Sequence, residues 1–429
     1  MQSRPENLPE EARLRDRDDP LSSFKSHFYG LEGGAIYLDG NSLGLLSREA
    51  EAAALQALDQ WKRLGVEGWS EASPAWFTLP EQIAAQVAPL VGASENEVIV
   101  TGSTTVNLHQ LLATLYDPTN AERPKILADA LAFPSDIFAI ESHLRLRGLD
   151  PERHLVKVPS RDGFLLTEDD ILAAMTPDVQ MAVLPAVVYT SGQLLPLQRI
   201  TAEARRRGIL IGWDCSHSIG AVPHSFDDWD IDFAFWCHYK YLNAGPGAVG
   251  GLYLNRRHFG KAPGLAGWFS SRKERQFDMT HTLSPADGAG GLQIGTPHIL
   301  SLAPLSGSLT LHEYAGMDRL RTKSLALTDF LRQAIIQELS AFGVTIVTPA
   351  HDDQRGGHLA LVHPEAAQIS RALRKAGVIP DFRPPNIVRL APVPLYTSFA
   401  DCWEAVSRLR RILENDTYRE MNEGSSLVP

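Results

Sequence analysis

The stretch GWDCSHSIGAVPHSFDDWDIDFAFWCHYKYLNAGPGAVGG, residues 212–251, decides the fold. It takes in the end of one apolar run, ILIGWDC, and the whole of a second, DFAFWC, and polar side chains follow each run. Continuous apolar runs of this length predict strands that are buried on both faces of a parallel sheet. Ligands bind such sheets outside the carboxyl ends of the strands, so Asp214 and Lys240 are the first candidates for a site.

The same alternation extends in both directions from this stretch. Before it, strand-like runs EVIVTGS, KILADALAF, HLVKV and QMAVLPAVVY are separated by helical patterns at 104–116, 137–146 and 167–175, with a further helix starting near Pro196. After it, GGLYL closes the series. Strands that alternate with helices predict an α/β domain with a mostly parallel sheet. We place this large domain at residues 50–310.

A second pattern occupies the C-terminal part of the chain. Apolar residues recur at helical spacing in 324–339, 366–377 and 403–413, and the strand-like runs VTIVTP, HLALVH and NIVRLAP lie between them. This predicts a smaller α+β domain at 311–423 with about three antiparallel strands. Residues 1–49 are expected to form an N-terminal arm that contributes to the small domain. The last residues, 424–429, read as a disordered tail or a vector remnant.

Composition excludes several classes of protein. The 429 residues carry 40 Lys and Arg against 51 Asp and Glu, a formal net charge of −11, which disfavours nucleic acid as a partner. No apolar run approaches the ~20 residues that a membrane span needs, and the charged N-terminus lacks the core of a secretory signal. Three scattered cysteines do not suggest a disulfide framework or a metal site. We therefore expect a cytoplasmic globular protein without a metal.

Lys240 and Asp214 form the most informative pair of residues. Each follows or ends an apolar run, and they lie 26 positions apart in the sequence. A lysine at a strand end can be an ordinary surface residue. Alternatively it can hold pyridoxal phosphate as a Schiff base, with Asp214 beside the pyridine nitrogen. That cofactor accepts electrons only while its ring nitrogen is protonated, and a nearby carboxylate favours the protonated form.

Two other motifs in this stretch are misleading. Gly245, Gly247 and Gly250 match G-x-G-x-x-G, but a dinucleotide fingerprint follows a strand and opens a helix, whereas here a strand-like run comes next. A turn close to Lys240 is the better interpretation. Asp214, Ser216 and His217 imitate a hydrolase triad within four residues, yet neighbours along a strand point to alternating faces. We expect neither a dehydrogenase nor a serine hydrolase.

Residues after the first two strands suit a phosphate and an aromatic ring. Thr104 and Thr105 lie between a predicted strand and the predicted helix that follows it. The N-terminus of a helix favours an anion, although a simple N-cap explains the same pattern. Phe133 and Asp136 follow the next strand. A strand-end aromatic ring can lie over a pyridine ring, and a carboxylate can bond to its polar edge; a helix start with Pro134 at its first turn is the alternative.

Arg389 lies inside the apolar run NIVRLAP of the small domain. A buried arginine needs an anionic partner. Its planar fork can bind a substrate carboxylate through two hydrogen bonds, or it can form a structural ion pair with another residue. The sequence leaves both possibilities open.

Taken together, these motifs resemble the kynureninase family of fold type I pyridoxal-phosphate enzymes, which are related to the class V aminotransferases. The similarity runs from YLDGNSLGLL at Tyr37 to the final helix. It includes TTVNL, FPSD, WDCSHSIGAVP, YKYLNAGPG, GWFS and RLAPVPLYTSF. One departure is LPAVVYTSG, where Pro185 and Val188 replace residues that are often polar, although Tyr189 remains.

The resemblance implies a role for each matching residue. Lys240 carries the Schiff base, Asp214 contacts the pyridine nitrogen, and Tyr239 is a phosphate ligand and a candidate proton relay. The other cofactor-binding residues implied are Thr104, Thr105, Phe133, Asp136 and His217, with Trp268 and Thr296 reaching the phosphate from a second subunit of a homodimer. The substrate-binding residues implied are Arg389 for the α-carboxylate, Asn41 in GNSLG, and Trp69 and Gly295 at the aryl ring.

The resemblance also implies the reaction, which is hydrolytic cleavage of L-kynurenine to anthranilate and L-alanine, with 3-hydroxykynurenine as the alternative substrate. The expected setting is tryptophan catabolism or NAD biosynthesis. Another class V lyase, such as a cysteine desulfurase, is the closest rival, but those enzymes use a cysteine on a mobile loop. Cys215 and Cys237 lie within or beside strand patterns and Cys402 lies on a predicted helix. A non-catalytic protein with the same fold is disfavoured because Lys240, Asp214 and Arg389 are all present.

Overall fold

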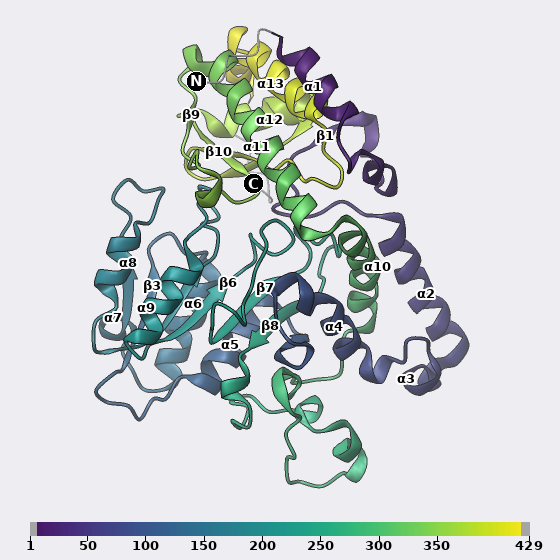
Figure 1. Cartoon of the computed structure of the whole chain (residues 1–429), viewed down its shortest axis with the longest axis vertical. Helices are drawn as coiled ribbons and strands as arrows, with labels where there is room; N and C mark the ends of the chain where they lie inside the picture. Colours follow the sequence, from purple (N-terminus) through teal and green to yellow (C-terminus); the bar gives the residue numbers. More distant parts are fainter. Residues whose placement is uncertain (1–6, 422–429) are drawn as a thin grey trace.

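The computed structural model describes residues 7–421, which form a large lower body and a smaller upper lobe (Figure 1). A seven-stranded sheet lies in the lower body, in the order β2-β8-β7-β6-β5-β3-β4. Its strands are β2 (Val98–Val100), β3 (Lys125–Asp129), β4 (Leu155–Val158), β5 (Val179–Pro185), β6 (Leu210–Asp214), β7 (Phe233–Cys237) and β8 (Gly250–Leu254). All seven strands match runs predicted from the sequence.

The direction of the strands follows from their connections. From β7 to β4 neighbouring strands are parallel, whereas β8 runs antiparallel to both β7 and β2. The turn from β7 to β8 contains no helix, and without a crossover the chain returns in the opposite direction. The predicted α/β class with a mostly parallel sheet is confirmed. Both β5 and β7 are buried along their whole length, and their side chains are apolar on both faces except for Gln180 of β5.

Helices connect and cover these strands. They are α5 (Thr104–Leu115), α6 (Pro134–Leu146), α7 (Pro151–His154), α8 (Glu168–Ala174) and α9 (Leu197–Arg206) among the crossovers, and α2 (Arg48–Leu64), α3 (Gly68–Glu71), α4 (Leu79–Val91) and α10 (Ile299–Ala315) at the right of Figure 1. Helix α10 packs along α2. Between β8 and α10 the chain forms a long segment of short 3₁₀ turns, which projects from the bottom of the body in Figure 1.

The upper lobe combines a small sheet with four helices. Its antiparallel sheet has the order β12-β13-β10-β9, with β9 (Thr345–Ile346), β10 (Leu359–Val362), β12 (Asp381–Arg383) and β13 (Ile387–Leu390). The helices are α1 (Leu8–Arg17), α11 (Met317–Leu339), α12 (Ala366–Lys375) and α13 (Phe399–Glu414). The sequence predicted three of these strands; β12 is a fourth. A short parallel pair joins β1 (Ile36–Tyr37) to β11 (Val378–Ile379).

Each lobe has its own apolar core. One core surrounds the seven-stranded sheet, and a second in the upper lobe includes Leu8 and Leu38 from the N-terminal segment together with α11, α12 and α13. A third, smaller cluster lies between them. Helix α11 runs from the body into the upper lobe and connects the two (Figure 1). The predicted tail at 424–429 lies outside the described residues.

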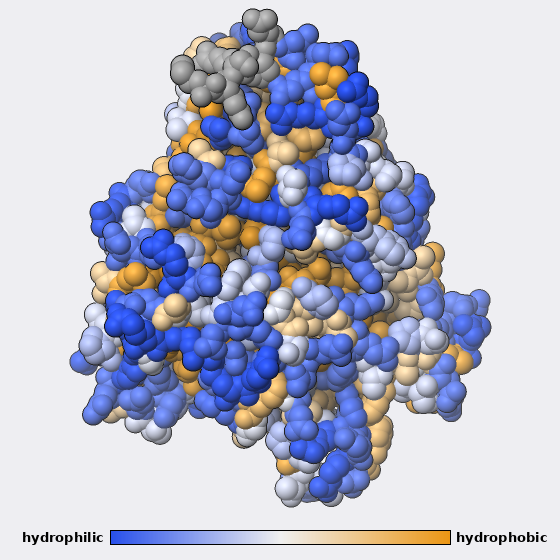
Figure 2. Space-filling model, in the orientation of Figure 1, coloured by the Kyte–Doolittle hydropathy of each residue, from blue (hydrophilic) through white to orange (hydrophobic). Residues whose placement is uncertain are grey.

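The surface and the cysteines complete the description. Figure 2 shows hydrophilic side chains over most of this face, with hydrophobic patches gathered where the upper lobe meets the body. Among residues 7–421 no helix is long and apolar enough to cross a membrane, and no group of three or more His, Cys, Asp or Glu side chains is arranged to hold a metal. The three cysteines are free thiols, and all are buried.

Candidate active site

A pocket of about 300 Å³ opens at the carboxyl ends of the parallel strands. Asp214 ends β6, and Lys240 follows β7 by three residues. Adjacent parallel strands end at the same edge of the sheet, so two residues that are 26 positions apart in the sequence become neighbours in space. Eight of the residues that the sequence singled out line this pocket: Thr104, Thr105, Phe133, Asp136, Asp214, His217, Tyr239 and Lys240.

Lys240 contacts a histidine. Its Nζ lies 2.8 Å from Nε2 of His217, a buried residue whose Nδ1 has no hydrogen-bond partner in the structure. Burial lowers the pKa of His217 well below its usual value, and the charge of Lys240 lowers it further. A neutral imidazole therefore faces the amine, and its Nε2 can accept a hydrogen bond from Lys240 Nζ.

Asp214 is held by its neighbour Ser216. The Ser216 backbone N–H and hydroxyl both donate to Oδ1 of Asp214, at 2.9 and 2.5 Å. A hydrolase triad of Asp214, Ser216 and His217 is thereby excluded. The reason is not the alternation of strand faces that the sequence suggested. The chain leaves β6 at Asp214 and turns, so Ser216 bonds back to Asp214 while His217 points to Lys240.

Three carboxylates converge at this end of the pocket. Burial raises the pKa of Asp136 well above its usual value, and the charges of Asp214 and Asp129 raise it further, while Lys240 lowers it. Asp129, at the end of β3, is fully buried with one oxygen unpartnered, and burial raises its pKa to about 7. The sequence reasoning missed Asp129, although it ends a predicted strand just as Asp214 does. Such a cluster attracts a cationic group.

A helix N-terminus and aromatic rings also line the pocket. Thr104 and Thr105 are the first residues of α5, whose N-cap is Ser103, so the cap does not occupy either threonine hydroxyl. Phe133, the N-cap of α6, packs edge-on against Tyr189 with ring centroids 5.3 Å apart. In the stretch LPAVVYTSG, which differs from the family pattern, Pro185, Val187 and Tyr189 line the pocket, and Val188 is buried.

The residues present fit pyridoxal phosphate. A lysine amine is available for the aldehyde, and the carboxylate cluster suits a protonated pyridine nitrogen. The N-terminus of α5 offers backbone amides and hydroxyls to a phosphate. The glycines of the misleading motif support this geometry: Gly245 and Gly247 have φ of +86° and +73° in the turn between Lys240 and β8, and no helix follows.

The remaining predicted residues are not among those that line this pocket. Arg389 is completely buried, where it forms an ion pair with Asp381 and donates to the Tyr189 carbonyl at 2.6 Å. The structural ion pair considered from the sequence is therefore present. Asn41 is also completely buried, and neither side-chain atom has a hydrogen-bond partner. Its neighbour Ser42 lines the pocket.

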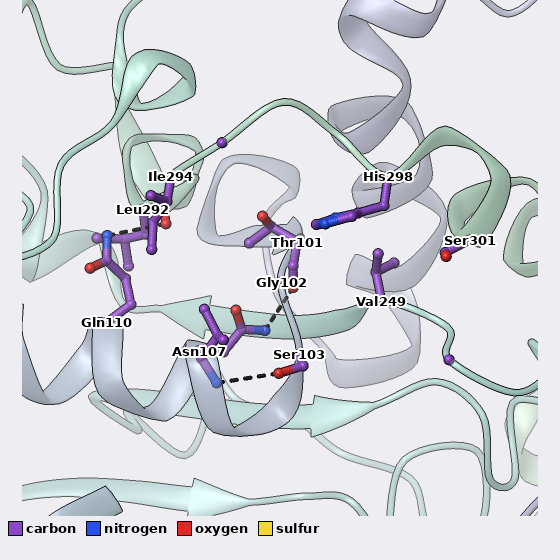
Figure 3. Close-up of a pocket in the computed structure, with 13 residues that line it drawn as sticks. Thr101, Gly102, Ser103, Asn107, Gln110, Val249, Leu292, Ile294, His298 and Ser301 are labelled. Atoms are coloured by element: carbon purple, nitrogen blue, oxygen red, sulfur yellow. Dashed lines mark hydrogen bonds between the residues drawn. The ribbon is translucent and has the colours of Figure 1, made fainter. Parts of the chain in front are cut away.

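Trp69, Trp268, Gly295 and Thr296 are on other surfaces of the chain. Trp69 and Trp268 both pack against Phe269 in an aromatic cluster, with ring centroids 6.5 and 5.5 Å away. Gly295 and Thr296 are exposed. Gly295 borders a second pocket of about 440 Å³, which Ser103, Asn107 and His298 also line (Figure 3).

The fold and this pocket define the class of the protein, which is that of the fold type I pyridoxal-phosphate-dependent enzymes. A solved structure whose title records glycine covalently linked to its PLP cofactor matches with a TM-score of 0.78 and 19% identity, covering 90% of this chain and 98% of that one. A cysteine desulfurase from Escherichia coli matches with a TM-score of 0.75 and 19% identity over 92% of this chain and 98% of its own. At this identity the likeness shows the fold alone.

Closer relatives settle the family. "Kynureninase" of Geobacillus thermodenitrificans (strain NG80-2) is 56% identical over 417 residues, 97% of each chain, and "Kynureninase" of Shouchella clausii (strain KSM-K16) is 51% identical over 98% of this chain and 97% of its own. The family model "Kynureninase C-terminal domain" matches residues 320–409. The chain belongs to the kynureninase family. The predicted family, hydrolase activity and pyridoxal phosphate cofactor are thereby confirmed.

Proposed function

We propose that this member of the kynureninase family cleaves L-kynurenine to anthranilate and L-alanine in the pocket around Lys240, with the residues named above in their predicted roles. The observation that carries the assignment is the convergence of Lys240, His217 and Asp214 from two neighbouring strand ends. When bound, pyridoxal phosphate supplies an aldehyde that joins an amine and a protonated ring that accepts electrons from it.

The residues of the chain then divide the work. Lys240 Nζ would hold the cofactor, and its amine, when free, would remove the proton from the substrate Cα. His217 Nε2, 2.8 Å away, orients that amine. Asp214 keeps the ring nitrogen protonated. Burial raises the pKa of Tyr239, so its phenol stays protonated and could donate a proton to the substrate Cβ once water has added to the γ-carbonyl carbon and the Cβ–Cγ bond has broken.

Lys240→Ala tests the assignment directly. The variant is expected to fold, and to lose both the visible absorbance that pyridoxal phosphate gives with the wild-type protein and the release of anthranilate from L-kynurenine, followed by fluorescence. Alanine is quantified in parallel to establish equal amounts of the two products. A variant that keeps the wild-type absorbance removes Lys240 from the Schiff base.

We further propose that the active unit is a homodimer in which Trp268 and Thr296 reach the partner's pocket. The segment that carries them exposes an unusual number of large apolar side chains: Leu265, Trp268, Phe277, Met279, Leu283 and Leu300 are each more than a third exposed. Large apolar side chains that are exposed together along one segment are typical of an interface. The exposed Gly295 and the aromatic cluster of Trp69 would then lie at the same boundary.

Mixing two inactive variants tests the shared site. Lys240→Ala and Trp268→Ala chains, each inactive alone, are unfolded, mixed and refolded together. A hybrid dimer then contains one pocket with both residues intact, and random pairing restores about a quarter of the wild-type activity. No recovery beyond the sum of the two variants would place Trp268 in its own chain's site, or outside the site altogether.

A further inference from the structure

Two arginines of the small domain face the pocket differently. Arg383, on β12, lines the pocket, and its side chain is 23% exposed. Arg389, on β13, is completely buried and lies outside the lining residues. The two strands pair in antiparallel register, so the two guanidinium groups come from neighbouring strands of one sheet.

Both arginines share one carboxylate. Arg389 pairs with Asp381 through Nε and Nη2, and Arg383 Nε donates to the same Oδ2 of Asp381 at 3.1 Å. Asp381 is itself buried, with 1% of its side chain exposed. The single negative charge of Asp381 therefore lies at hydrogen-bond distance from two positive charges, those of Arg383 and Arg389. Asp39 adds a more distant carboxyl, whose pKa burial raises to about 6, so it only partly offsets this excess.

The hydrogen bonds that each guanidinium already makes decide which of the two arginines has donors left for an added anion. The fork of Arg389 is engaged on both sides, by Asp381 and by the Tyr189 carbonyl. Arg383 has only Asp381 at Nε and a weak 3.4 Å contact from Nη2 to the Ser42 hydroxyl, which Nη2 of Arg389 also contacts at 3.4 Å. Within residues 7–421 no acceptor is recorded for its Nη1. A guanidinium with a free edge in a pocket matches a carboxylate.

We propose that Arg383 is the residue that binds a carboxylate directly in this pocket, with the charge of Arg389 behind it, and that Asp381 is the positioning residue that holds its fork. The inference rests on the proposed function only in that the carboxylate belongs to an α-amino acid. Asp381 fixes Nε, which leaves Nη1 and Nη2 for the ligand, and Ser42 marks the place where the ligand oxygen would lie.

Binding of two small amines to the holoenzyme tests this proposal without the cleavage reaction. L-Alanine has the α-carboxylate and L-alaninamide does not, and binding of each is followed through the change in the cofactor's visible absorbance. Wild-type protein is expected to prefer L-alanine. Arg383→Met is expected to reduce that preference by about 10- to 100-fold, as for loss of a charge-assisted hydrogen-bonded pair. Arg383→Lys, which keeps the charge but not the fork, should reduce it less.

Two comparisons make the result specific. Arg145→Met removes an arginine whose side chain is 61% exposed on α6, and it should keep the wild-type preference. Thermal melting of each variant checks the fold, which the remaining Arg389–Asp381 pair is expected to preserve in Arg383→Met. If that variant fails to fold, Arg383→Lys carries the test.

An unchanged preference in the folded Arg383 variants would overturn the proposal, and so would an equal loss of affinity for both ligands. The kynureninase assignment fails separately. Wild-type protein that distinguishes L-alanine from L-alaninamide through Arg383 but releases no anthranilate from L-kynurenine would leave the carboxylate site standing and refute the proposed reaction.

Discussion

Replacement of Asp214 by asparagine measures what the carboxylate contributes to the cofactor ring. The change keeps the shape of the side chain and, at Oδ1, the acceptor that Ser216 bonds at 2.9 and 2.5 Å, so it removes little except the charge. An opposite charge at close range moves a pKa by about one to three units, and each unit is worth about 1.4 kcal/mol. We therefore expect kcat for L-kynurenine to fall by about 10- to 1,000-fold.

The neighbouring carboxyl decides where in that range the result lies. Asp214 is among the groups that raise the pKa of Asp136, so its neutralisation allows Asp136 to ionise more readily and to replace part of the lost charge. The single variant should accordingly lie near the lower half of the range. Asp136→Asn in the Asp214→Asn background removes this compensation, and the double variant should lose about tenfold more.

The assay is anthranilate fluorescence at saturating pyridoxal phosphate, with bound cofactor measured by absorbance so that weak binding is not mistaken for slow chemistry. Asp59→Asn is the matched control, because that carboxylate lies on α2 with 55% of its side chain exposed. A folded Asp214→Asn enzyme that binds the cofactor and works within threefold of the wild-type rate would refute the role of Asp214.

Two predictions concern stability. A Cβ added at Gly212 of β6 would lie 1.9 Å from the ring of Phe233, so Gly212→Ala should destabilise the protein by about 1–3 kcal/mol in a denaturant titration, whereas Gly30→Ala, where nothing lies within 4 Å, should cost little. Equal midpoints for the two variants would contradict this packing. Burial lowers the pKa of His143 to about 4, so the unfolded chain gains a proton there first as pH falls from about 6.5, and stability is lost between about pH 6.5 and 4. His143→Gln should flatten the fall in melting temperature over that window and the exposed His281→Gln should not; the same slope in both variants would refute the assignment.

The elements that the sequence predicted are those held by apolar burial. Most strands of the large sheet read as nearly continuous apolar runs, such as FAFWC in β7, because both faces of the sheet are covered there. Strand β12 was missed because Asp381 and Arg383 are charged. The ion pair of Asp381 with Arg389, made between strands, stabilises it instead, and Arg383 pairs with Asp381 within the strand; no local sequence pattern indicates such pairs. The antiparallel direction of β8 likewise depends on its neighbours.

The same distinction holds for the candidate site. Residues directly after strands, such as Asp214, Lys240 and Phe133, could be found because the fold brings strand ends together. Asp129 also ends a predicted strand, so it could have been predicted as a site residue in the same way. Arg383 enters the pocket from the other lobe, so its position depends on how the two lobes pack. His358, buried 5.8 Å from the His217 ring, also comes from that lobe and gave no signal in the sequence.

The pocket has opposite charges on its two sides, and this arrangement suits an amino acid joined to a pyridine ring. Asp214, Asp136 and Asp129 come from the edge of the large sheet and favour a cationic ring nitrogen. Arg383, with Arg389 behind it, comes from the small lobe and favours a carboxylate. Since the two sides belong to different cores, a ligand that pairs with both also holds the lobes together. Binding of an α-amino carboxylate should therefore raise the melting temperature of the holoenzyme more than an equally saturating amine without the carboxylate, and equal shifts would argue against a contact with the small lobe.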